Sequence, residues 1–69
     1  MNEYSRIILE QYCSTHRKRK LARLVRLSYD MAADVTDTDA LYLANLIDQT
    51  EDEEMRAALK DLDDYLFGW

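Results

Sequence analysis

A line of cations and aromatic rings gives this sequence its best candidate for chemistry. Its members recur at steps of three and four residues, so they share one face of a helix. They are Tyr12, His16, Arg19, Arg23 and Arg26. An arginine stripe that includes aromatic rings can follow a phosphate backbone. Nucleic-acid binding through this basic helix is therefore one hypothesis. The alternatives are a solvated helix face and an internal partner for the acidic fourth helix, expected at residues 51–67.

The two halves of the chain carry opposite charge. Residues 1–33 contain seven Lys/Arg and three Asp/Glu, a net charge of +4. Residues 34–69 contain two Lys/Arg and eleven Asp/Glu, a net charge of −9. Such asymmetry indicates charged partners, or halves that neutralise each other within one fold. The overall charge of −5 favours a protein partner over nucleic acid, because domains that bind nucleic acid are usually basic.

The charge pattern also predicts a homodimer. In an antiparallel pair the arginine stripe of one chain, at positions 19, 23 and 26, meets Glu53, Asp63 or Asp64 of the other. Closed two-fold pairing is the commonest form of association for small chains.

Enzymatic and metal chemistry is poorly represented. Cys13 and His16 are three residues apart, but no third residue orients the pair, and the only glycine, Gly68, leaves no glycine-rich loop. One Cys and one His cannot form a four-ligand zinc site. The aspartates of residues 34–39 lack the glycine and the terminal glutamate of a calcium loop. We therefore expect no enzyme, no metal and no cofactor.

A strongly apolar segment at residues 40–47 predicts a helix that is apolar on all sides. It is either the central helix of a bundle or a helix with one flank, Tyr42 and Leu46, left for a partner. Near the C-terminus, Phe67 falls on a polar helix face and Trp69 follows Gly68. These two aromatics either fold back onto the core or anchor a partner. The leading hypothesis is a small regulatory protein that docks on another protein through these four hydrophobic residues, with acidic residues as the rim.

Hydrophobic periodicity predicts four helices, at residues 3–14, 17–33, 37–49 and 51–67, and no strand. Asn2 serves as the first N-cap, and Thr50 with Glu53 reads as a capping box for the last helix. A break near residues 14–17 is expected because the first two apolar stripes differ by roughly a third of a turn. The fold class is therefore all-α, a compact small bundle of about four helices forming a single domain over residues 1–69.

The centre of this bundle is predicted from the apolar stripes. Its members are Leu24, Val25, Leu41, Ala44, Ile47, Met55, Leu59 and Leu62. With one cysteine there is no internal disulfide. No apolar run resembles a signal peptide or a membrane span, so a cytoplasmic location without membrane contact is expected.

Overall fold

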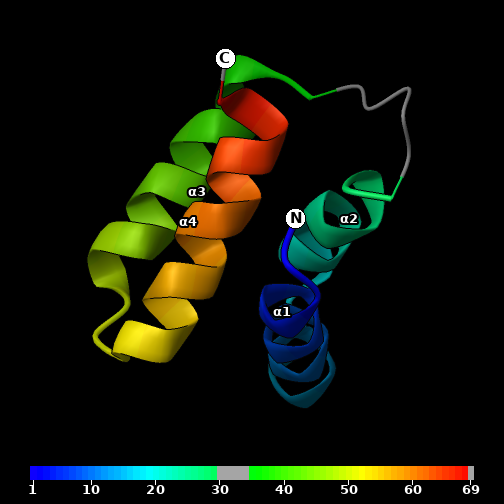
Figure 1. The fold of residues 1–69 in the computed structure, drawn as a ribbon. Coiled ribbons are helices and arrows are strands. Elements are labelled where there is room, and N and C mark those ends of the chain that lie inside the picture. Colours follow the sequence, from blue (N-terminus) through cyan, green and yellow to red (C-terminus); the bar gives the residue numbers. More distant parts are fainter. Residues whose placement is uncertain (30–34, 69) are drawn as a thin grey trace.

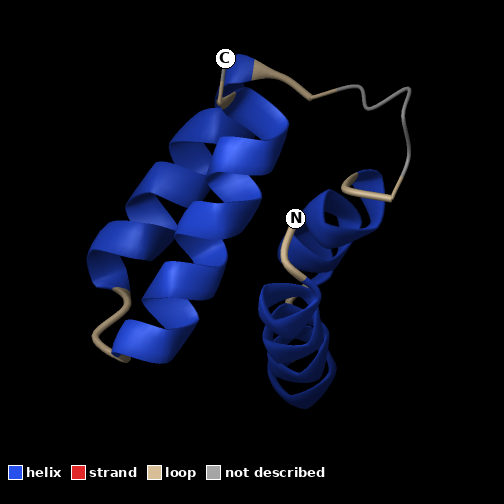
Figure 2. Cartoon of the chain, in the orientation of Figure 1, coloured by secondary structure: helices blue, strands red, loops and turns tan. Residues whose placement is uncertain are grey.

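The computed structural model, which describes residues 1–29 and 35–68, contains four helices and no strand in those ranges. They are α1 (Glu3–His16), α2 (Arg19–Leu27), α3 (Asp37–Gln49) and α4 (Glu53–Phe67) (Figures 1 and 2). The prediction of a small all-α bundle is confirmed. The limits of α3 match the prediction, whereas α2 ends at Leu27 and is followed by a turn at residues 28–29. Residues 30–33 of the predicted second helix lie outside the described ranges.

Two helix pairs make up the bundle. Helices α3 and α4 lie side by side as an antiparallel hairpin, and α1 packs against α4 (Figure 1). Helix α2 packs against α1, to which it is joined by only two residues, Arg17 and Lys18. The basic and acidic halves of the sequence thus become two adjacent layers. None of the described helices has the length and apolar character needed to cross a membrane.

The junction between α1 and α2 is a Schellman-type ending. Arg17 adopts the left-handed conformation with φ 53°, and the Lys18 N–H donates to the carbonyl of Cys13 at 3.2 Å. This turn is the predicted break between the first two helices, and it separates His16, the last residue of α1, from Arg19, the first residue of α2. The cation-rich start of α2 has no side-chain cap and no acidic residue in its first turn.

The caps of the hairpin differ from the predicted ones. Thr36 and Asp39 form the capping box, at the start of α3. The predicted box between Thr50 and Glu53 is wrong, because Asp52 caps α4 by accepting from the Glu54 N–H at 3.0 Å. Thr50 instead ends α3, where its hydroxyl donates to the carbonyl of Leu46 at 2.6 Å.

The core lies where α1, α2 and the hairpin meet. Its fully buried large side chains are Leu9, Leu21, Leu24, Leu43, Leu59 and Leu62. Of the eight predicted core residues, five are buried and Met55 is half-buried.

The predicted burial of Leu41 and Ala44 is wrong: Leu41 is 64% exposed and Ala44 is exposed. Leu43 occupies the buried side of α3 in their place. Residues two apart on a helix point about 200° apart, so burying Leu43 turns Leu41 to the outside. Helix α3 is therefore apolar on a side that the rest of the described chain does not cover.

Candidate functional site

The residues predicted to bind a protein partner lie in different places. Tyr42 and Leu46 are half-buried and pack against the core, and the Lys20 ammonium lies 4.9 Å from the centroid of the Tyr42 ring. This flank of α3 therefore faces α2. Phe67 is also half-buried against the core. Trp69 lies outside the described residues.

An exposed apolar strip lies on the other side of the hairpin, and we call this side the outer face. Leu41, Ala44 and Asp48 follow one another along α3 at helical spacing. Beside them runs a groove of about 370 Å³. It is lined by Ala44, Ile47, Asp48, Lys60, Asp63 and Asp64, and by no residue of α1 or α2. Sequence reasoning missed this face, because it assigned Leu41 and Ala44 to the core.

Carboxylates dominate the groove of the outer face. Burial raises the pKa of Asp63, and the negative charge of Asp64 raises it further. Among the described residues, Lys60 is the one cation in the lining of this groove. The outer face therefore combines exposed apolar side chains with a negative border.

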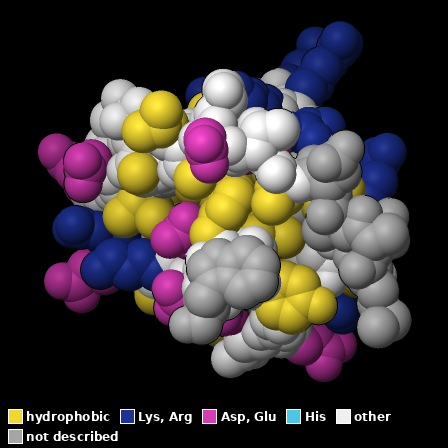
Figure 3. Space-filling model, turned by 90° about the horizontal axis from the view of Figure 1, so that it is seen from above, with side chains coloured by type: hydrophobic (Ala, Val, Ile, Leu, Met, Phe, Trp, Pro, Cys, Tyr) yellow, Lys and Arg dark blue, Asp and Glu magenta, His cyan; other side chains and the backbone are white. Residues whose placement is uncertain are grey.

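A second surface, the basic junction, lies at the turn between α1 and α2. Its cations are all exposed: Arg17, Lys18, Arg19, Lys20 and, further along α2, Arg26. The ion pairs between described residues are Arg6–Glu3 at 3.6 Å and Arg23–Asp39 at 2.6 Å, so none of the five takes part in one. Seen from above, Lys and Arg side chains stand out at the upper right, while carboxylates and cations mix at the left (Figure 3).

Two rings of the predicted basic line are stacked beside this junction. The centroids of Tyr12 and His16 are 4.4 Å apart with an interplanar angle of 28°. His16 Nδ1 lies 3.2 Å from the Tyr12 carbonyl oxygen. A polar groove of about 400 Å³ adjoins the stack. Its lining residues are Tyr12, His16, Lys18, Leu46, Gln49, Thr50, Glu51, Asp52 and Met55. We call it the stack groove.

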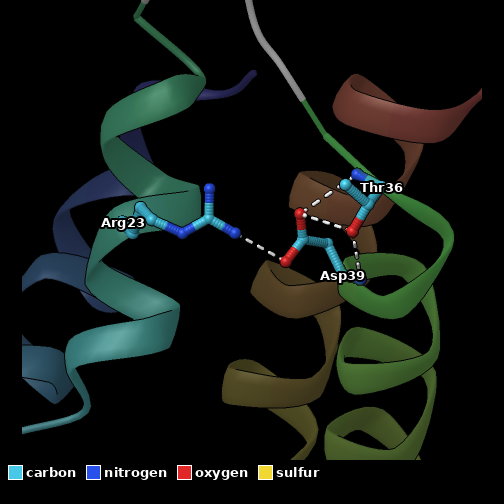
Figure 4. A network of polar contacts seen from close by, with 3 residues as sticks. All are labelled: Arg23, Thr36 and Asp39. Carbon is cyan, nitrogen blue, oxygen red and sulfur yellow. Dashed lines mark hydrogen bonds and ion pairs between the residues drawn. The ribbon is translucent and has the colours of Figure 1, made fainter.

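Arg23, the fourth member of the basic line, pairs with Asp39 across the bundle (Figure 4). Its guanidinium donates to Asp39 Oδ1 at 2.6 Å. Asp39 is only 3% exposed, and its Oδ2 accepts from the backbone N–H and the hydroxyl of Thr36 at 3.1 and 3.3 Å. Burial alone raises the pKa of Asp39, but the hydrogen bonds from Arg23 and Thr36 and the charge of Arg23 together hold it below its ordinary value. Arg23 thus has an internal acidic partner, but this partner lies at the start of α3 and not on the acidic fourth helix that the sequence pattern indicated.

The thiol of Cys13 is placed unfavourably for nucleophilic chemistry. Cys13 is buried, and burial, followed by the negative charge of Glu10, raises its pKa. His16 is exposed and stacked on Tyr12. Across residues 1–29 and 35–68, no three His, Cys, Asp or Glu side chains gather closely enough to hold a metal ion.

The chain matches no family model, no curated protein and no solved structure. Its function is therefore argued from its own residues. Two surfaces of opposite charge, the acidic outer face and the basic junction, are the candidate binding sites.

Proposed function

We propose that this chain is a small non-enzymatic interaction protein that docks on another protein through the outer face of the α3–α4 hairpin. The observation that supports this most directly is Leu41, which is 64% exposed in the middle of a regular helix. Full burial of a leucine side chain contributes about 1.5–3 kcal/mol, and the described fold leaves most of that contribution unused. Binding of a partner that covers Leu41 and Ala44 is stabilised by this burial free energy.

The charge of the outer face defines the chemistry of the partner. Asp48, Asp63 and Asp64 border the apolar strip, with Lys60 as the cation among them. An amphipathic helix with Lys or Arg beside its apolar residues fits such a groove, as in helix-in-groove recognition. Cations placed beside Asp63 and Asp64 also relieve the repulsion between these two neighbouring carboxylates.

The homodimer remains a prediction, with a changed set of contacts. Because Arg23 is held by Asp39, the exposed Arg19 and Arg26 are the members of the stripe that can meet Asp63 or Asp64 of a second copy. Such a dimer covers part of the outer face, so it competes with the protein partner. Sedimentation equilibrium at low and high salt measures it: we expect a dimer at low salt that dissociates as salt rises. A monomer at high micromolar concentration and low salt contradicts it.

A synthetic amphipathic helix of leucine and lysine residues tests the docking proposal. We expect the chain to bind this peptide and Leu41→Gln to weaken binding about ten-fold, since it removes the central apolar contact. Isothermal titration calorimetry measures the affinity. Ile7→Gln is the matched control, because Ile7 is 45% exposed on α1, outside the outer face. No binding, or an equal loss in both variants, contradicts the proposal.

A further inference from the structure

The stack groove and the basic junction meet at Lys18. The groove takes one wall from the end of α1, with the stacked rings of Tyr12 and His16, and the other from the α3–α4 turn at residues 49–52. Lys18 lines the groove, and its chain neighbours Arg17 and Arg19 are exposed beside it. A ring surface, a polar wall and a group of exposed cations are thus side by side.

We infer that the stack groove holds one base of a single-stranded nucleic acid, whose flanking phosphates lie on Arg17, Lys18 and Arg19. This site is separate from the outer face and does not depend on the function proposed for it. It joins members of the predicted basic line, Tyr12 and His16, to residues from a distant part of the chain.

The rings provide the surface for the base. His16 is exposed, is stacked on Tyr12 and lines the groove, so its ring is available to a base that enters there. All four bases can stack on such rings. Proteins that bind single strands combine stacking surfaces of this kind with a line of cations that contacts the phosphate backbone. Duplex DNA cannot use the groove, because its bases are already stacked and paired.

The cations provide the phosphate contacts. Arg17, Lys18 and Arg19 make no ion pair with any described residue. The first turn of α2 has no acidic residue and no side-chain cap, so its backbone N–H groups add to the positive potential there. A phosphate placed at this junction relieves the repulsion among neighbouring cations.

The opposite wall selects the base. Glu51 and Asp52 line it, and their carboxylates repel phosphates that approach from that side. The same carboxylates accept hydrogen bonds from an exocyclic amino group, as acidic side chains do from N4 of cytosine. Asp52 Oδ1 already accepts from the Glu54 N–H, which leaves Glu51 as the better acceptor for a base. The groove therefore prefers cytosine to thymine, which presents only carbonyl oxygens and one ring N–H.

Fluorescence anisotropy with labelled 12-nucleotide oligo(dC) and oligo(dT) tests the inference at about 50 mM salt, where phosphate contacts are strong. We expect oligo(dC) to bind about ten-fold more tightly than oligo(dT), the size of one base-edge discrimination. His16→Ala is expected to weaken oligo(dC) binding about ten-fold by removing the stacking surface. Lys18→Ala with Arg19→Ala is expected to weaken both oligonucleotides and to reduce the dependence of affinity on salt.

Two variants separate base recognition from simple charge attraction. Arg56→Ala removes a positive charge from α4, outside the groove, and is expected to change binding little. Glu51→Gln removes a negative charge, so attraction alone predicts tighter binding of both oligonucleotides, whereas base recognition predicts loss of the oligo(dC) preference. The inference is overturned by absence of binding, by equal loss in the α4 control, or by a duplex that binds as well as oligo(dC) without any effect of His16→Ala.

Discussion

Leu59→Ala is expected to lower the free energy of unfolding by about 3 kcal/mol, within the range found for buried leucines. Leu59 is 1% exposed at the centre of the core, on the side of α4 that packs into the bundle. A chain of 69 residues has a small core, so this loss is a large part of its total stability. Urea unfolding followed by circular dichroism at 222 nm measures the change.

Leu41→Ala is the matched control, because it deletes the same atoms from an exposed position. Leu41 is 64% exposed, and alanine is the better helix former, so its free energy of unfolding is expected to stay within about 0.5 kcal/mol of the parent. The comparison separates the two leucines that the sequence pattern places together in the core. A loss at Leu41→Ala as large as that at Leu59→Ala contradicts the described packing of α3.

The sequence pattern predicts the helices well because their signals are local. The short polar residues from Thr36 to Asp39 mark the start of α3, and the apolar spacing after them can be read without knowing the neighbours. The buried side of α3 cannot be read in this way. A helix that is apolar all round fits several orientations, and only its packing against α4 decides that Leu43 faces inward and Leu41 outward.

The candidate sites depend on long-range contacts in the same manner. Periodicity correctly aligns Tyr12 with His16, but the wall at residues 49–52 is more than thirty residues away along the chain. Arg23 belongs to the same stripe as Arg19, yet it forms an ion pair with Asp39 across the bundle. One local signal for Asp39 existed: a threonine followed three residues later by an acidic residue resembles a capping box. That signal predicts the capping of α3 by Thr36 and Asp39, but it does not predict the ion pair between Asp39 and Arg23.

Arg23→Ala is expected to lower the free energy of unfolding by about 2 kcal/mol at pH 7, because it leaves the carboxylate of Asp39 buried without its cation. This loss of unfolding free energy is smaller than that expected for breaking a fully buried ion pair, because the Arg23 side chain is 49% exposed and Thr36 still donates to Asp39. Arg19→Ala is the control with the same charge change. Arg19 is exposed and makes no ion pair with a described residue, so its effect is expected to stay within about 0.5 kcal/mol.

The pH dependence identifies the ion pair as the cause. The pKa of Asp39 is lowered in the folded state, so its contribution to stability is present above the ordinary pKa of about 3.9 and is lost as the pH falls through the folded value. Without Arg23, its hydrogen bond and its charge no longer lower the pKa of Asp39, so the variant takes up its proton at a higher pH than the parent. The difference in unfolding free energy between parent and Arg23→Ala is therefore largest at pH 7 and narrows as the pH falls below about 4. Urea titrations from pH 7 to pH 3 measure this difference. If the difference in unfolding free energy stays constant over that range, Arg23 acts through the packing of its aliphatic stem and not through its charge.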